Sequence, residues 1–183
     1  MTEDGRPENQ LIAECGCETK TIQYSIMSEE IKKLEPRDLW CNFYSLTQIP
    51  RPSKKEKKAA LFIREFGEQL GLETRMDAAG NVLIRKPPFP GYENRKTVVL
   101  QAHIDMVPQA NSSIDFNFDT DPIDAFIDGE WVSARDTTLG ADNGIGVAAS
   151  LDVLQNKNLE HGPIEVLVTV DEEAGMTGAF RFQ

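Results

Sequence analysis

Two short apolar runs constrain the fold of this chain more than any other feature of its sequence. TVVLQA at 97–102 and IEVLVTV at 164–170 are rich in β-branched residues and nearly continuously apolar, which is typical of buried strands. Between them, the apolar residues at 142–154 predict a helix. This alternation of strands and helices predicts an α/β fold with a mixed, mainly parallel sheet flanked by helices.

Weaker patterns describe the rest of the chain. They predict helices at 36–49 and 53–70, strands at 72–76 and 81–86, and an edge hairpin at 125–133. Ser53 and Glu56 have the spacing of a capping box, so we expect both to cap the second helix. The basic residues near its start are expected on its solvated face: Arg51, Lys54, Lys55, Lys57 and Lys58. We expect these two helices to contribute packing and no chemistry.

One domain accounts for the periodic part of the chain. The 183 residues of the chain are enough for a single core. Residues 1–26 show neither the helical nor the strand period. Met27 opens the segment MSEEIKKLEP, in which Ser28 can cap a short helix. We therefore expect 27–183 to form the domain, and 1–26 to be a disordered leader or a mis-annotated start.

The charge and polarity of the chain exclude several partners. Thirty acidic residues against 19 basic ones give a formal net charge of −11 at pH 7, so we expect no nucleic-acid binding. No apolar run approaches the ~20 residues of a membrane helix, and the polar start MTEDGRPENQ is unlike a secretory signal, so we expect no membrane partner. Three cysteines without metal or disulfide spacing indicate free thiols, and these features together predict a cytoplasmic protein.

A histidine and an aspartate follow the first apolar strand directly. His103 and Asp105 are two residues apart, and in an extended chain such residues point the same way. Asp105 can therefore contact one imidazole nitrogen and leave the other for a metal. Alone the pattern is weak, because a single histidine at a strand end more often has a structural role.

Glycines surround an aspartate where a loop enters the helix at 142–154. In TTLGADNGIG, at 137–146, Asp142 lies at or near the helix N-terminus, where it can act as a cap. The glycines allow the backbone to approach another group closely. The motif has neither a Gly-Lys-Ser/Thr nor a GxGxxG pattern, which argues against a nucleotide-binding loop.

Three carboxylates, Asp171, Glu172 and Glu173, follow the second apolar strand. Such a run is usually a solvated loop, but open α/β sheets bind ligands outside the carboxyl ends of their strands. We expect the two glutamates to meet His103 and Asp142 at one edge of the sheet. Nitrogen and carboxylate ligands suit zinc, manganese or cobalt, and a carboxylate shared by two metal ions would build a two-metal hydrolase site. A neighbouring carboxylate that binds no metal could act as the base.

These segments resemble the M20 metallopeptidases. The likeness is carried by AHIDMVPQ, DGEWVSARDTTLGADNGIGVAASLDVL and HGPIEVLVTVDEEAGMTGAF, and it runs from about Met27 to Gln183. Within that family, the TTLGADNGIG string is similar to the dipeptidases in particular. The resemblance implies a zinc-peptidase-like catalytic domain, of which this chain would be the N-terminal part.

The resemblance also implies a role for each candidate residue. His103 would be a terminal ligand of one metal, Asp142 the ligand that bridges both, and Glu173 a ligand of the second. Asp105 would orient His103, and Glu172 would be the base that activates metal-bound water. The implied cofactor is a pair of Zn²⁺ ions, with Mn²⁺ or Co²⁺ as alternatives. The implied reaction is hydrolysis of dipeptides with a free N-terminus, Xaa-His dipeptides among them.

The chain departs from the family pattern in several respects. Family members have a further acidic ligand, a distal histidine ligand and an inserted dimerisation or lid domain, and none of these precedes Gln183 here. We therefore expect a truncated domain in which one or both metals bind weakly or not at all, and a homodimer only where the missing domain is present. The family usually has glycine at the position of Asp136, and an added carboxylate there can perturb the loop.

Three alternatives are open at the level of sequence. The chain could be a non-catalytic remnant, which a metal titration would reveal. It could be a related M20 amidohydrolase or deacylase, although the TTLGADNGIG string argues against this, and a panel of free and N-acylated dipeptides separates the two. It could also be a generic acidic α/β domain with capping carboxylates, but several independent features converge on the metal site.

Overall fold

A four-stranded mixed sheet forms the centre of the computed structural model, which describes residues 29–182. The predicted leader at 1–26 lies outside the described residues. The strands follow the spatial order β1-β2-β6-β3. Their bounds are Glu73–Met76 for β1, Val82–Lys86 for β2, Val98–His103 for β3 and Ile164–Thr169 for β6. All four coincide with predicted strands to within a residue or two.

The strand directions follow from the connections. β3 pairs with β6 in parallel, which sets His103 opposite Thr169 at the carboxyl ends of both strands. β1 and β2 are antiparallel, because the tight turn at 77–80 joins them, and β2 is antiparallel to β6. The predicted mixed sheet flanked by helices is confirmed. Its balance differs from the expectation, since one of these three pairings is parallel.

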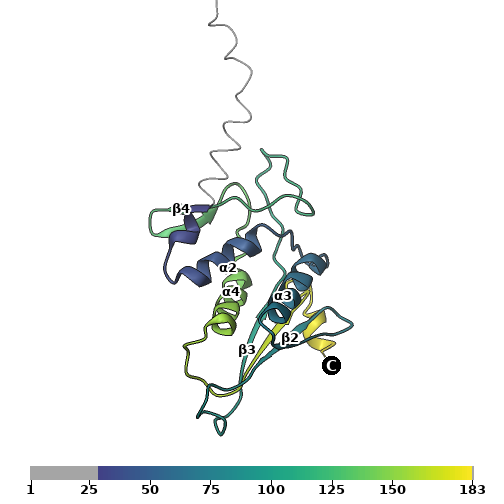
Figure 1. The fold of residues 1–183 in the computed structure, drawn as a ribbon. Helices are drawn as coiled ribbons and strands as arrows, with labels where there is room; N and C mark the ends of the chain where they lie inside the picture. Colours follow the sequence, from purple (N-terminus) through teal and green to yellow (C-terminus); the bar gives the residue numbers. More distant parts are fainter. Residues whose placement is uncertain (1–28, 183) are drawn as a thin grey trace, which may run out of the picture.

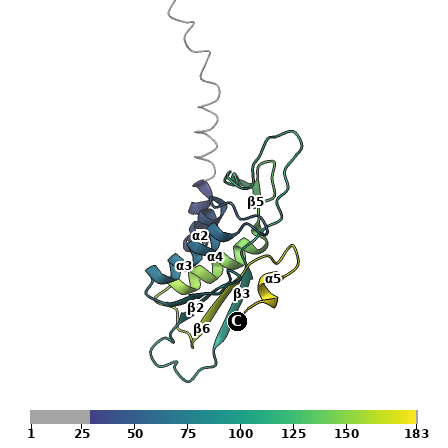
Figure 2. The ribbon, with the colours of Figure 1, turned by 90° about the vertical axis from the view of Figure 1, so that its right-hand side faces the viewer.

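Three helices lie on one side of this sheet, as Figures 1 and 2 show from two directions. They are α2 (Arg37–Thr47), α3 (Lys57–Gln69) and α4 (Ala141–Gln155), and a short 3-10 helix, η2 (Glu30–Lys33), precedes them. Two of them, α3 and α4, contact the strands, and α2 packs on α4. Alternate residues of the central strands, such as Ile84 and Val166, face the helices and are fully buried. They pack with apolar helix residues such as Ile63, Val147 and Leu151 in a single core.

Two smaller elements complete the described part of the chain. β4 (Ala125–Asp128) and β5 (Trp131–Ala134) form the predicted antiparallel hairpin, which is separate from the main sheet. The short helix α5 (Thr177–Phe180) follows β6 after a turn. Over 29–182, the structure contains no helix with the length and apolarity needed to cross a membrane.

We predict that Gly67→Ala destabilises the domain, although alanine is normally favoured in helices. A Cβ atom at this buried α3 position would lie 2.4 Å from Thr74 Oγ1 and 2.9 Å from Ile84 Cδ1, so α3 would have to move off the sheet. The expected loss in free energy of unfolding is about 1–3 kcal/mol, measured by urea denaturation. Glu65→Ala, at an exposed position of the same helix, is the control. The double variant Gly67→Ala/Thr74→Ala should recover part of the loss; an unchanged or raised stability of Gly67→Ala would contradict the packing described.

Candidate metal centre

The candidate residues gather at the edge of the sheet where two parallel strands end. His103 is the last residue of β3, and the turn with Glu172 and Glu173 begins two residues after β6. Asp142 stands in the first turn of α4. Because β3 and β6 run in the same direction and are adjacent, their carboxyl ends open to the same side. The parallel pairing therefore explains why His103 and Glu172, which are 69 positions apart, become neighbours.

His103 is buried, and its two ring nitrogens face different groups. Nδ1 lies 3.2 Å from the carbonyl oxygen of Asp105 and 3.4 Å from its Oδ1. Nε2 lies 3.1 Å from Asp142 Oδ1 and 3.9 Å from Glu172 Oε2. A proton on Nδ1 would point at Asp105, and Nε2 would then present its lone pair toward the two other carboxylates.

The Asp105 carboxylate is fully buried and accepts hydrogen bonds from several segments. Oδ1 accepts the Glu172 amide at 3.0 Å, and Oδ2 accepts the Glu173 amide at 3.1 Å and the Ser53 hydroxyl at 2.7 Å. Burial alone would raise the pKa of Asp105, but hydrogen bonds from His103, Glu172, Ser53 and Glu173 hold it well below its ordinary value. Asp105 is therefore an anion at neutral pH, and it positions the backbone of both glutamates as well as the histidine.

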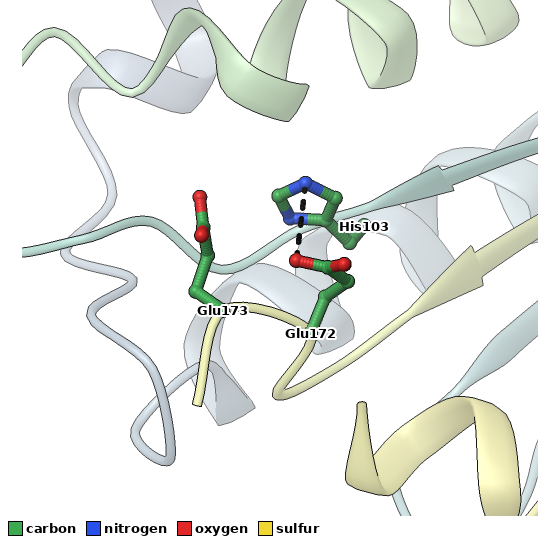
Figure 3. A group of neighbouring side chains, drawn as sticks. All are labelled: His103, Glu172 and Glu173. Carbon is green, nitrogen blue, oxygen red and sulfur yellow. Dashed lines mark ion pairs between the residues drawn. The ribbon is translucent and has the colours of Figure 1, made fainter. Parts of the chain in front are cut away.

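Glu172 and Glu173 present their carboxylates to the space beside the imidazole. One oxygen of each and a ring nitrogen of His103 lie within 4.8 Å of one another. Figure 3 shows Glu172 beneath the ring and Glu173 to one side of it, both rising from the same turn. Glu172 is partly buried and Glu173 is exposed. One nitrogen and two carboxylates at this spacing fit a divalent cation such as zinc, manganese or cobalt.

Asp142 approaches the cluster from the opposite segment and is open to solvent. Its side chain is 86% exposed, and its backbone and that of Asn143 are non-helical although they lie within α4. Asp142 does not act as the helix cap, the alternative that the sequence allowed; Asn143 does, because its Oδ1 accepts the Gly146 amide at 3.1 Å. The Asp142 carboxylate is thus left to face His103.

The imidazole of His103 is surrounded by negative charge. The hydrogen bond to Asp105 raises the pKa of His103 to about 9, burial opposes the rise, and Asp142 and Glu172 add to it. Without a metal, the ring is therefore protonated at neutral pH. A metal ion at Nε2 would have to displace this proton, which couples metal binding to pH.

The predicted capping box at Ser53 and Glu56 is wrong, and the structure gives both residues another role. α3 begins at Lys57 without a side-chain cap, and the Ser53 hydroxyl donates to Asp105 instead. Glu56 is buried and accepts the Asp171 amide at 3.0 Å. Burial raises the pKa of Glu56 above its ordinary value. A local pattern could not reveal this, because Glu56 and Asp171 are 115 positions apart.

The prediction that Arg51 is solvated is also wrong. The four lysines of the cluster are exposed as expected, but Arg51 is only 2% exposed. Its guanidinium donates to the carbonyls of Ile104 and Gly140, each at 2.7 Å. Burial lowers the pKa of Arg51 to about 10, and the charge of Asp105 opposes this, so the side chain remains a cation near neutral pH. One member of this basic run, Arg51, therefore belongs to the protein interior, although its neighbours in the run are at the surface.

Asp136, where the family resemblance expects glycine, adopts the left-handed conformation with φ of 59°. Glycine favours this region, and aspartate is among the residues that tolerate it best. The Asp136 carboxylate accepts a hydrogen bond from Asn111 Nδ2 at 2.7 Å, and its carbonyl accepts the Asn111 amide at 2.8 Å. The added charge is therefore engaged with the neighbouring loop.

Comparisons with known proteins agree with the resemblance seen in the sequence. Residues 99–182 match the model of Peptidase family M20/M25/M40. The chain is 53% identical to the cytosol non-specific dipeptidase of Escherichia coli strain K12 over 154 residues, which cover 84% of this chain and 32% of that protein. The chain thus spans about a third of the length of this relative.

Solved structures give the same picture. The crystal structure of the aminoacylhistidine dipeptidase from Vibrio alginolyticus superposes with a TM-score of 0.81 at 57% identity, covering 84% of this chain and 32% of that one. The aminopeptidase PepT of Bacillus cereus superposes with a TM-score of 0.66 at 26% identity, covering 82% and 40%. The fold and the sequence therefore agree on the same group of peptidases.

We predict that the metal-free chain loses stability as the pH rises. Because the pKa of His103 is about 9 in the folded chain and ~6.5 when unfolded, its contribution is complete below about pH 6.5 and is lost as the pH passes about 9. The expected loss is up to ~3 kcal/mol, measured by urea denaturation with a chelator at several pH values. His103→Gln should flatten this dependence and His161→Gln should retain it. If the free energy of unfolding depended on pH equally in wild type and His103→Gln, the loss of stability would not come from His103.

A second prediction concerns the buried carboxylate of Asp105. Asp105→Asn leaves one oxygen to accept, and its NH₂ group must face an amide or hydroxyl donor, so we expect a loss of about 2–4 kcal/mol in free energy of unfolding. Ser53→Ala removes a single hydrogen bond to the same carboxylate and should cost only about 1 kcal/mol. Chemical denaturation of both variants at pH 7 measures the difference. Equal losses would mean that the two backbone amides contribute nothing.

Proposed function

We propose that this chain, which belongs to peptidase family M20/M25/M40 over residues 99–182, supplies metal-binding and proton-transferring residues of a metal-dependent dipeptidase. One observation carries the proposal: a ring nitrogen of His103 and oxygens of Glu172 and Glu173 lie within 4.8 Å of one another at the shared edge of β3 and β6. The identity to two dipeptidases, 53% and 57%, supports the choice of reaction.

The metal ligands in this proposal are His103, Asp142 and Glu173. Nε2 of His103 and Oδ1 of Asp142 already face each other at 3.1 Å, and an oxygen of the exposed Glu173 lies within 4.8 Å of a ring nitrogen of His103. Zinc is the cation we propose, with manganese or cobalt as alternatives, since all three accept mixed nitrogen and oxygen ligands. When bound, a metal pair would polarise the scissile carbonyl and acidify water, the chemistry of two-metal hydrolases.

The chain's own residues would direct the proton in this reaction. Glu172 is proposed as the general base, which accepts the proton of the attacking water and returns it to the leaving amine. Asp105 accepts a hydrogen bond from the Glu172 amide and contacts His103 Nδ1. A single buried anion therefore fixes the position of the proposed base relative to a proposed metal ligand. Asp105 is therefore proposed to act on catalysis through orientation.

The proposed substrates are dipeptides with a free N-terminus, including Xaa-His. This choice follows the names of the two relatives, a non-specific dipeptidase and an aminoacylhistidine dipeptidase. The word cytosol in the name of the Escherichia coli relative supports the proposal that this protein also acts in the cytoplasm.

The metal proposal predicts a saturable site that depends on one of the two histidines. Titration of the 183-residue chain with Zn²⁺ or Co²⁺ by calorimetry should give binding that His103→Gln and Asp142→Asn each weaken by at least about tenfold. His161→Gln is the matched control and should bind as wild type, because His161 contacts the carbonyl of Gly162 in a distant turn. The absence of saturable binding in wild type, or an equal loss in His161→Gln, would refute the site.

The role of Glu172 is tested by separating binding from hydrolysis. Glu172→Gln keeps the shape of the side chain but cannot accept a proton, so metal affinity should change little while dipeptide hydrolysis falls by about 10²–10⁴-fold. The assay compares free dipeptides with their N-acetylated forms in the metal-loaded protein. Preference for the acetylated forms would favour a deacylase. Metal binding without hydrolysis in wild type would favour a non-catalytic domain.

A further inference from the structure

Arg51 is a buried cation in a segment that carries no candidate ligand. It follows α2 by four residues and lies in the loop that leads to α3, with 2% of its surface exposed. Burying a guanidinium is costly unless its N–H groups find acceptors. Its Nε has no hydrogen-bond partner among the described residues, so the two Nη groups provide the compensation.

The two Nη groups join the two halves of the candidate metal centre. Nη1 donates to the carbonyl of Ile104, the residue after His103, at 2.7 Å. Nη2 donates to the carbonyl of Gly140, two residues before Asp142, also at 2.7 Å. The guanidinium is flat and rigid, so a single side chain fixes the separation of these two backbone segments.

Glycines of the TTLGADNGIG string make room for this side chain. A Cβ atom at Gly140 would lie 2.6 Å from Arg51 Nη2, and one at Gly144 would lie 2.8 Å from the same atom. Gly140 also has φ of +69°, a conformation that side chains disfavour. The sequence indicated that these glycines let the backbone approach another group, and that group is the Arg51 guanidinium.

The loop that carries Arg51 is itself tied to the end of β3. The Met106 amide donates to the Arg51 carbonyl at 3.2 Å, and the Ser53 amide donates to the Met106 carbonyl at 3.3 Å. The Ser53 hydroxyl adds its bond to Asp105 at 2.7 Å. Arg51 therefore projects from a backbone held in place, and it spans from there to Gly140.

We propose that Arg51 is a positioning residue that holds the loop before Asp142 against the end of β3 and thereby sets the spacing between Asp142 and His103. This inference deepens the proposed function, because the spacing matters for a metal held by those two side chains. Its structural part concerns the metal-free chain and can be tested separately.

The first test measures amide hydrogen exchange in the metal-free 183-residue chain. Arg51→Met and Arg51→Lys are compared with Ile63→Ala, a core variant in α3 that lowers stability without touching the centre. Residues 139–147 should exchange at least about tenfold faster in Arg51→Met than in Ile63→Ala at matched stability. Arg51→Lys should lie between them, since lysine retains the charge but lacks the fork that reaches both carbonyls.

The second test uses Co²⁺ alone as a probe of ligand geometry. Arg51→Met should weaken Co²⁺ binding by about 10–100-fold and alter the visible spectrum of the bound ion, while Ile63→Ala should match wild type in both. If wild type binds no Co²⁺, the proposed function fails, and the exchange experiment alone decides the role of Arg51.

Two results would overturn the positioning role. Exchange of 139–147 in Arg51→Met equal to that in Ile63→Ala would make Arg51 a packing residue. Full recovery by Arg51→Lys would mean that its charge alone matters, as a counterion to Asp105. Should Arg51→Met fail to fold, Gly144→Ala serves in its place, because its Cβ atom would displace the guanidinium.

Discussion

The buried carboxylate of Asp105 is the interaction on which the candidate centre depends. It is fully removed from solvent, and its two oxygens join the end of β3, the turn after β6 and the loop before α3. An anion in such a place is stable only when hydrogen bonds replace its hydration, and here they come from two backbone amides, a hydroxyl and an imidazole. The surrounding elements must therefore all be in place for this one charge to be accommodated.

In the turn after β6, buried side chains from other segments also accept hydrogen bonds from the backbone. Four successive amides, from Val170 to Glu173, each donate to a side chain from another part of the chain. The acceptors are Asn81 for the first, Glu56 for the second and Asp105 for the last two. Side chains thus take over where the strand ladder ends. Glu172 and Glu173 project from a backbone that is already held on one side, which leaves their carboxylates free for chemistry.

Much of this arrangement could be predicted from the sequence, for identifiable reasons. The strands at 97–102 and 164–170 have the length and composition of buried strands, so the edge where His103 and Glu172 meet followed from the topology. Ser53, Glu56 and Arg51 were misjudged, because a capping box and a basic run are local patterns that describe helix starts correctly on average. Glu56 does accept the local Lys54 amide, but the partners that tie the three residues to the centre are 52 to 115 positions away, and no local pattern encodes them. The share of antiparallel pairing was underestimated because the β1–β2 turn and the loop before β3 both reverse the chain.

The parallel register of β3 and β6 has a consequence for the order in which the protein is made. Among residues 29–182, the backbone amides that donate to the Asp105 carboxylate are those of Glu172 and Glu173, and the register that sets His103 opposite Thr169 brings them there. A nascent chain that has passed Asp142 but not residue 173 contains the anion, the imidazole and the guanidinium, yet lacks the amides that stabilise the anion. In that interval the buried site of Asp105 cannot form with all its hydrogen bonds. The region around Asp105 should therefore fold only after β6 and the turn that follows it have been synthesised.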